Sequence, residues 1–323
     1  MQKRVLGAMF LVVVVVLACS YALFAESKNL KIAMILWRGE TDGEKGFKDG
    51  LEVLGYAVDY TTMNAGQDRK ELGRILREEL EPKINDFDYI YTFGTTASQM
   101  TRDFVKDRVP QIFNIVADPV GAGIVRSMEA SGGNISGTSN GIPMPLQIET
   151  ALKIIQFKRL GLLFNPREKN SMVERQKLYD IAAKFHFEVV DLRSPPAQDV
   201  LEQNLRELID KSVVVDAVYL ATDSFIVSNA KLVGSKLIEA KIKSFCSIQS
   251  YVDNGALMGV VSDYYQLGKA SASIVDRHKK GEKLHNISIE ITRDPTLVIN
   301  KTTANLLNIT IPEAVLKKVI LVE

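Results

Sequence analysis

The sequence has few of the residues from which cross-links and metal sites are built. It contains two cysteines and three histidines among 323 residues, and no Cys or His cluster has the spacing of a zinc site. Cys19 lies in the apolar N-terminal segment, so Cys246 is alone in the rest of the chain. We therefore expect no metal and no internal disulfide, and stability must come from burial of apolar side chains.

The sequence also lacks an excess of charge of either sign. It has 40 Lys and Arg against 39 Asp and Glu, a formal net charge of +1. A polybasic surface, on which nucleic-acid binding depends, is not indicated, so we expect no nucleic-acid partner. With 46% hydrophobic and 24% charged residues, the composition is that of an ordinary globular protein, and we expect no cofactor.

Long hydrophobic runs are confined to the N-terminus. Two basic residues precede an apolar run from Val5 to Ala18, which is typical of a secretory signal. The sequence VLAC at Val16–Cys19 resembles a lipobox, which favours lipidation of Cys19. Cleavage after LFA at Leu23–Ala25 and an uncleaved membrane anchor are the alternatives. We take residues 1–25 as the signal peptide, and in every case the rest of the chain lies outside the cytoplasm.

Beyond the signal, short apolar runs alternate with amphipathic stretches. Lys31–Trp37 has the pattern of a buried strand, and the stretch that follows places Phe47 and Leu51 on one helical face. The alternation begins again at Lys158–Phe164. Such a βαβ series indicates a parallel sheet with helices on both faces. The sequence thus predicts an α/β protein with two doubly wound parallel-sheet lobes.

The segment between the two series, GGNISGTSNGIPMP at Gly132–Pro145, has the composition of a hinge. Two lobes joined in this way enclose a cleft between the carboxyl ends of their sheets, where such folds bind ligands. We expect Ser139 and Asn140 to offer polar groups to the ligand at this crossing.

GTSNG in this segment also fits the G-x-S-x-G pattern of a serine nucleophile. The order Ser139, Asp223 and then His278 or His285 satisfies a catalytic triad on paper. However, the pattern requires a helix directly after the serine, and the two prolines of IPMP disfavour one. A serine hydrolase using Ser139 is therefore an alternative interpretation and not the favoured one.

Several further segments occur together: NAGQD, TFGTTASQ, VADPVGAGIV, LLFNPREKNS, YLATDSFIVSN and DNGALMGVVSDYYQLG. From about Ile32 to the C-terminus the chain resembles the ABC-transporter substrate-binding protein family, which has the type I periplasmic-binding fold. The resemblance implies a monomeric, non-enzymatic receptor that captures a small molecule by hinge closure and delivers it to an ABC permease. A lipid anchor would be its only contact with the membrane.

The resemblance also implies a ligand class and a division into lobes. Some members take up aromatic amino acids, so an aromatic or apolar amino acid is the leading ligand, with sugars, nucleosides and peptides as alternatives. A sensory module for a membrane signalling protein is an alternative role. Three crossings would place residues 30–141 and 262–288 in the N-terminal lobe and residues 142–261 and 289–323 in the C-terminal lobe. After the first strand, family members carry a histidine-containing segment where this chain has WRGETDGE.

The segment FGTTASQM offers the best local chemistry for an anion. Thr95, Thr96 and Ala97 open a helix directly after a strand, so free backbone N–H groups point at the strand ends. Such a site suits a carboxylate, although capping of the helix by Thr95 or Thr96 is the alternative.

Acidic residues follow one strand in each lobe. Asp118 and Asp223 stand at equivalent places, and we expect them to face one another across the cleft. Asp223, with Thr222 beside it, is the preferred partner for a ligand ammonium group. Asp118 has an alternative role in capping the turn that follows it.

Three further residues are candidates for ligand contact. Trp37 ends the first strand and is either an aromatic wall of the cleft or a packing residue. Asn170 faces the cleft or caps a helix, and Gln249 closes the rim of the second lobe.

Overall fold

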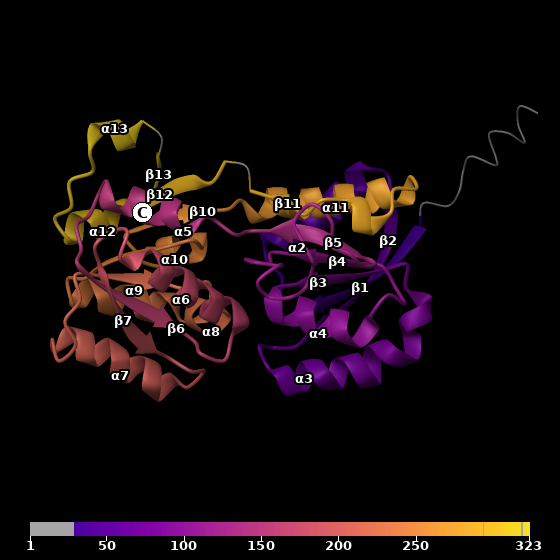
Figure 1. The fold of residues 1–323 in the computed structure, drawn as a ribbon, viewed down its shortest axis with the longest axis horizontal. Coiled ribbons are helices and arrows are strands. Elements are labelled where there is room, and N and C mark those ends of the chain that lie inside the picture. The colour runs from indigo at the N-terminus through magenta and orange to yellow at the C-terminus, as the bar shows by residue number, and fades with distance from the viewer. Residues whose placement is uncertain (1–28, 293, 318) are drawn as a thin grey trace, which may run out of the picture.

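The computed structural model describes residues 29–292, 294–317 and 319–323 and consists of two α/β lobes side by side (Figure 1). The predicted signal peptide and the lipidation site Cys19 lie outside the described residues, so both stay predictions. Among the described residues, no helix has the length and apolar character needed to cross a membrane.

The N-terminal lobe is built on a six-stranded sheet with the strand order β11-β5-β4-β3-β1-β2. Every paired strand in it is parallel to its neighbour. Its strands are β1 (Asn29–Leu36), β2 (Ala57–Asn64), β3 (Tyr89–Phe93), β4 (Gln111–Asn114), β5 (Ile135–Ser139) and β11 (Glu290–Ile291). Its helices include α2 (Asp42–Val53), α3 (Arg69–Arg74), α4 (Thr95–Val105) and α11 (Tyr264–Lys279).

The C-terminal lobe is built on a seven-stranded sheet with the order β13-β12-β10-β9-β8-β6-β7. Its strands are β6 (Arg159–Phe164), β7 (Glu188–Arg193), β8 (Ala217–Leu220), β9 (Lys243–Cys246), β10 (Met258–Val261), β12 (Thr296–Asn300) and β13 (Val319–Val322). Its helices are α5 (Met144–Leu152), α6 (Lys169–Ala182), α7 (Gln198–Ile209), α8 (Ser224–Ser228), α9 (Ala230–Glu239), α10 (Gln249–Asp253), α12 (Lys301–Leu306) and α13 (Glu313–Leu316).

The prediction of two parallel-sheet lobes is confirmed, with one antiparallel pair in the second sheet, where β12 runs opposite to β10. The chain leaves the C-terminal lobe after β10 and comes back to it before β12, and it crosses at the same edge both times (Figure 1). A strand that starts at the carboxyl edge of a parallel sheet has to run away from it, so β12 is antiparallel.

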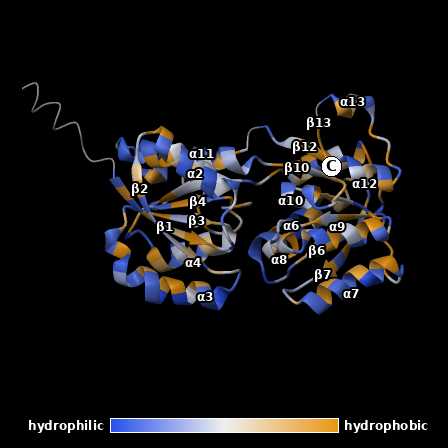
Figure 2. Ribbon diagram, turned by 180° about the vertical axis from the view of Figure 1, so that it is seen from behind, coloured by the Kyte–Doolittle hydropathy of each residue, from blue (hydrophilic) through white to orange (hydrophobic). Residues whose placement is uncertain are grey.

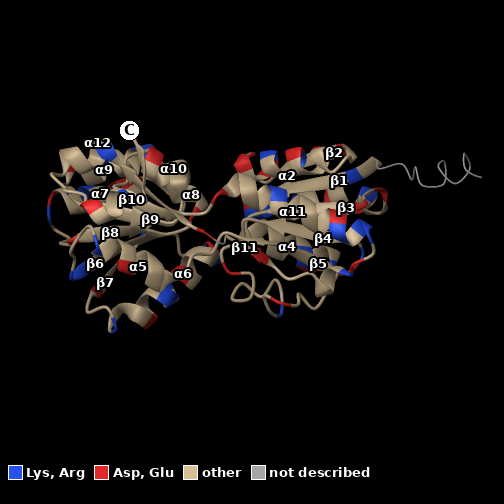
Figure 3. Ribbon diagram, turned by 90° about the horizontal axis from the view of Figure 1, so that it is seen from above, with Lys and Arg blue, Asp and Glu red and all other residues tan. Residues whose placement is uncertain are grey.

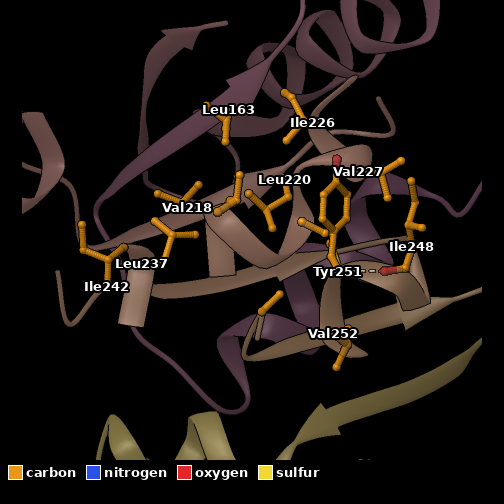
Figure 4. Close-up of a cluster of buried hydrophobic side chains, with 14 of the residues drawn as sticks. Leu163, Val218, Leu220, Ile226, Val227, Leu237, Ile242, Ile248, Tyr251 and Val252 are labelled. Carbon is orange, nitrogen blue, oxygen red and sulfur yellow. Dashed lines mark hydrogen bonds between the residues drawn. The ribbon is translucent and has the colours of Figure 1, made fainter. Parts of the chain in front are cut away.

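Each sheet is covered by apolar side chains on both faces, as expected for a doubly wound fold. Alternate residues of β1 show the reason: Ile32 and Met34 belong to one buried cluster, whereas Ala33 and Ile35 belong to the other. Figure 2 shows the strands as mostly hydrophobic and the outer helices as two-faced. In the second lobe, side chains from β6 and β8 meet residues of α8, α9 and α10 in a similar cluster (Figure 4).

Three crossings join the lobes: after β5, after β10, and between β11 and β12 (Figure 1). The second crossing brings α11 back to the first lobe, where it packs along α2. Because β11 pairs with β5 at Glu290 and Ile291, the first sheet extends past residue 288. We therefore propose the predicted lobe boundaries with the last crossing moved beyond Ile291.

Candidate ligand-binding cleft

Three adjoining cavities lie between the lobes at the carboxyl ends of the strands. A narrow central cavity of about 30 Å³ is lined from both lobes. It shares Thr95, Ala117 and Asn170 with an apolar cavity of about 420 Å³. On its other side it shares Arg38, Ile248 and Tyr264 with a polar cavity of about 910 Å³. The cleft is therefore one continuous site with an apolar end and a polar end.

Helix α4 begins at the wall of the central cavity. Gly94 precedes it with φ +84°, a left-handed conformation that glycine adopts readily, and no side chain caps the helix. The predicted alternative, capping by Thr95 or Thr96, is therefore wrong. Thr95 lines the cavity, and the buried Thr96 hydroxyl has no hydrogen-bond partner among the described residues. Ala97 packs in the core instead. The first N–H groups of a helix lack intrahelical acceptors, so this end can hold an anion.

Asp118 is bound to a lysine of the other lobe. The Nζ atom of Lys177 on α6 lies 2.5 Å from Asp118 Oδ2, and Gly121 donates its N–H to Oδ1 at 2.7 Å. Burial alone would raise the pKa of Asp118, but these donors outweigh it and hold the pKa below its ordinary value. The expected turn cap is present. The Asp118 carboxylate takes its ammonium partner from this chain, and the expectation that it faces Asp223 across the cleft stays a prediction.

Asp223 is almost wholly enclosed, with 1% of its surface exposed. It caps α8 by accepting the N–H of Ile226 at 2.8 Å, and it accepts the hydroxyl of Ser171 at 2.8 Å. The neighbouring Thr222 donates its hydroxyl to Glu174 at 2.5 Å. Both oxygens of Asp223 thus have donors within the protein, and its role as ammonium partner stays a prediction.

Two buried glutamates stand beside these residues, and the sequence analysis did not identify them. Glu168 accepts the N–H and the hydroxyl of Ser224, each at 2.9 Å. Burial and the charge of Asp223 raise the pKa of Glu168 to about 8. Burial also raises the pKa of Glu174. The second lobe therefore presents acceptor-rich, proton-binding groups to the cleft, and Figure 3 shows acidic residues where the lobes face each other.

Two asparagines lie at the junction of the lobes. Asn170 donates its Nδ2 to the carbonyl oxygen of Thr222, and its Oδ1 is buried without a partner among the described residues. Asn170 lies in the first turn of α6 and is not its cap, because Glu168 holds that position. Asn140 donates to the hydroxyl of Tyr264 at 3.2 Å and likewise has an unpartnered Oδ1.

Ser139 ends β5 and lines the apolar cavity. Its Oγ donates to the carbonyl oxygen of Ala117 at 3.3 Å and accepts the N–H of Gly141 at 3.1 Å. Helix α5 begins at Met144, with Pro145 in its first turn, where proline is well tolerated. Four residues separate the serine from that helix, so the expectation that no helix directly follows Ser139 is confirmed.

The catalytic triad considered from the sequence is not assembled among the described residues. No hydrogen bond joins Ser139, Asp223 and either histidine. His278 lies on α11 with its Nδ1 atom 2.7 Å from the hydroxyl of Tyr89, at a different part of the first lobe.

Trp37 and Gln249 differ in their relation to the cleft. Trp37 packs in the core of the first lobe with Met63 and Ala97 and lines none of the three cavities, which matches the packing interpretation. Gln249 lines the polar cavity, and its Nε2 donates to Asp253 at 3.3 Å.

Arg38 is a cleft residue that the sequence analysis did not single out, although it lies in the segment WRGETDGE. It follows Trp37 and lines both the central and the polar cavity. Tyr264 lines the same two cavities. The departure from the family pattern in that segment was the one signal that pointed to Arg38.

Buried polar atoms without partners gather at this cleft. Among the described residues, Arg38 Nε, Gln147 Oε1 and Asn170 Oδ1 belong to residues that line the cavities, and Thr96 Oγ1 and Asn140 Oδ1 belong to residues next in sequence to lining residues. Such atoms are rare in folded proteins because each costs free energy. A bound polar molecule would supply the missing donors and acceptors. Within the described ranges, no group of three or more His, Cys, Asp and Glu residues is arranged to hold a metal ion.

Comparisons with known proteins agree with this architecture. A protein from Clostridioides difficile, described as a tyrosine-binding protein, is 29% identical over 289 residues, covering 88% of this chain and 81% of that protein. The ABC domain from Streptococcus pneumoniae in complex with L-Trp superposes with a TM-score of 0.82 at 28% identity, covering 90% and 100% of the two chains. A ligand-free, open substrate binding protein from Clostridium difficile superposes with a TM-score of 0.69 at 24% identity, over 91% and 99%.

The family model described as ABC transporter substrate binding protein matches residues 33–322. This match spans both lobes, all three crossings and every residue that lines the cleft. The chain therefore belongs to the ABC transporter substrate-binding proteins, which capture small molecules outside the cytoplasm for a membrane permease.

Proposed function

We propose that this protein captures an aromatic amino acid in the cleft between its lobes. The observation that carries the proposal is the pairing of two features in one continuous site. Arg38 Nε and Asn170 Oδ1, buried and without hydrogen-bond partners among the described residues, belong to residues that line the central cavity, and a much larger, mostly apolar cavity adjoins it. An amino acid with an apolar side chain has this same division between a charged head and an apolar end.

The apolar cavity is suited to an aromatic ring. Met128 and Ile142 line it from the first lobe and the crossing, while Met144, Val173 and Ile181 line it from α5 and α6. Apolar and sulfur-containing side chains of this kind favour flat aromatic groups. The relatives described as binding tyrosine and L-Trp support the same ligand class.

The polar head of the ligand would lie in the central cavity. We propose that Thr95 and Thr96 at the start of α4, together with Ser139 and Asn140 at the first crossing, face it from the first lobe. Asn170 would accept a hydrogen bond from the ammonium group through its unpartnered Oδ1. Because this amide oxygen is neutral, it can accept the bond without the electrostatic repulsion that a second carboxylate would have with Asp223.

We further propose that the mature protein works as a monomer, anchored to the membrane through a lipid on Cys19. Closure of the lobes on the ligand would create the form that the permease recognises. The protein would carry out no chemistry on the ligand.

The proposal is tested by thermal unfolding and isothermal titration calorimetry of the domain from Lys28 onward. Tyrosine, tryptophan and phenylalanine are compared with sugars and nucleosides. A ligand at about 100 times its Kd stabilises the fold by about 2.7 kcal/mol, which a melting curve resolves. We expect at least one aromatic amino acid to do so and the sugars to have no effect. Stabilisation by a sugar alone would contradict the ligand class.

A matched pair of asparagine variants locates the site. Asn170→Ala should weaken binding of the aromatic amino acid about tenfold or more, because a charged donor loses its acceptor. Asn204→Ala is the control, since Asn204 also donates to a backbone carbonyl oxygen of the second lobe but lies outside the cleft. Turnover of an activated ester that disappears in Ser139→Ala would contradict a receptor without catalysis.

A further inference from the structure

We propose that Arg38 binds the carboxylate of the ligand and so selects for acids over amides and amines. This inference rests on the proposed function, because it concerns how the same cleft holds an amino acid. Arg38 would distinguish ligands by their charge. The site would then require a molecule that bears a carboxylate.

Arg38 lies in the cleft, beside both the central and the polar cavity. It lies two residues after the end of β1, an interior strand of the first sheet, at the carboxyl edge where the cleft lies. It lines the central cavity together with Gly94 and Thr95, and it lines the polar cavity together with Tyr264. Its positive charge opposes the rise that burial causes in the pKa of Tyr264, which shows that the two groups are close.

The guanidinium group of Arg38 has no polar partner among the described residues. No ion pair or hydrogen bond involves it, and its Nε is buried. The Cζ atom lies 5.4 Å from the centroid of the Phe93 ring, so the ring supports the guanidinium group without using its hydrogen-bond donors. Lys177, the other cation of the cleft, differs in this respect because Asp118 neutralises it.

The acidic groups in the same cavity already have donors of their own. Glu168 accepts two hydrogen bonds from Ser224, and Asp223 accepts bonds from Ile226 and Ser171. Neither carboxyl group forms an ion pair with Arg38, although both line the central cavity with it. Among the described residues that line the central cavity, the charge left without a polar partner is therefore positive, and an anion brought by the ligand would complement it.

A carboxylate suits this place for two reasons. Arginine binds carboxylates through two parallel N–H donors, which gives geometric specificity as well as strength. The start of α4, from Thr95 onward, adds backbone N–H groups from the same wall. The first lobe would then hold the carboxylate, and the acceptor-rich second lobe would hold the ammonium group. A zwitterion bound in this direction draws the two lobes together.

The test compares two ligands that differ only at the carboxylate. Binding of L-tyrosine and L-tyrosinamide, and of L-tryptophan and L-tryptophanamide, is measured by calorimetry on wild type, Arg38→Gln and Arg38→Lys. Wild type should bind the acid at least tenfold more tightly than the amide. Arg38→Gln should reduce that ratio at least tenfold by losing affinity for the acid alone. Arg38→Lys should give an intermediate ratio, because it keeps the charge and loses the paired donors.

Arg102→Gln is the matched control, because Arg102 lies on α4 of the same lobe and bonds to Gly123 away from the cleft. It should leave the ratio unchanged. The inference is overturned if wild type binds acid and amide equally, or if Arg38→Gln weakens both to the same degree. If no aromatic amino acid binds to wild type, the proposed function fails and the inference falls with it. Melting curves of each variant establish that the fold is intact.

Discussion

Lys177 and Asp118 join the two lobes through an ion pair, with Lys177 Nζ 2.5 Å from Asp118 Oδ2. A second bridge lies across the polar cavity, where Gln67 of the first lobe donates to Ser228 of the second at 2.8 Å. The two bridges flank the central cavity, because Lys177 and Asp118 line the apolar cavity on its other side. They are therefore placed to hold the two lobes together.

Lys177→Met should weaken the closed form. The pair is partly exposed to solvent, so its loss is expected to cost about 0.2–1 kcal/mol. Ligand affinity should fall by up to about fivefold, because binding must then drive more of the closure. Calorimetry measures the affinity, and small-angle scattering of the ligand-free protein should show a larger radius of gyration. Lys236→Met is the control, since Lys236 pairs with Glu239 inside one helix. An equal effect in both variants would contradict a bridging role.

Stability should fall as the pH rises through the neutral range, and Glu168 should be a main cause. Burial and the charge of Asp223 raise its pKa in the folded protein to about 8, against about 4.3 in an unfolded chain. A carboxyl group whose folded pKa is raised stabilises the fold below its unfolded pKa, and that contribution is lost as the pH rises toward the folded pKa. Melting temperatures between pH 5 and pH 8 should therefore decline.

Glu168→Gln should flatten this decline, because an amide does not titrate in that range. Glu239→Gln, on an exposed helical surface, should leave it unchanged. A wild-type melting temperature that rises over this interval would show that other groups dominate the balance.

Tyr91→Phe should destabilise the first lobe through a buried polar network. The hydroxyl of Tyr91 donates to Glu44 at 2.6 Å and accepts from Asn114 at 2.7 Å, and all three residues are buried. Removing it leaves a carboxyl oxygen and an amide nitrogen without partners, which should cost about 2–3 kcal/mol in the free energy of unfolding. Urea denaturation measures the loss. Tyr265→Phe removes a surface bond to Asp49 and should change stability by less than about 0.5 kcal/mol.

The division into two α/β lobes could be predicted because it depends on local patterns. Ile32, Met34 and their neighbours alternate between two buried faces, and that requirement appears directly in the sequence. The direction of β12 could not be read in this way, since Thr296–Asn300 has the same strand pattern in either direction. Only the place where the chain re-enters the second lobe decides it.

The site was harder to predict than the fold. A side chain can bind a ligand only if its charge or hydrogen-bonding atoms are not already paired within the protein. Asp118 and Asp223 looked available from their positions after strands, yet Lys177 and Ser171 occupy them. Arg38 looked unremarkable in the sequence, and its importance comes from having no hydrogen-bond or ion-pair partner in the part of the chain that the structure describes. Sequence patterns locate the edge of a sheet well, but they do not show which of its charges are already paired.

Gly268 on α11 lies against α2 so closely that no side chain fits between the two helices. A Cβ atom there would clash with the carbonyl oxygen of Gly43, and one on Gly46 would clash with that of Tyr265. Helix propensity alone predicts that Gly268→Ala stabilises the helix by about 1 kcal/mol. We expect the opposite sign, a loss of about 3 kcal/mol, because two helix backbones must separate.

Chemical denaturation of Gly268→Ala decides between these signs. Gly39→Ala is the control, since a Cβ atom there meets nothing within 4 Å. The result bears on the cleft as well as on the fold, because α11 begins at Tyr264, which lines the central cavity. A separation of α11 from α2 should displace Tyr264 and weaken ligand binding along with stability. A variant that is more stable than wild type would show that the two helices can move apart at little cost.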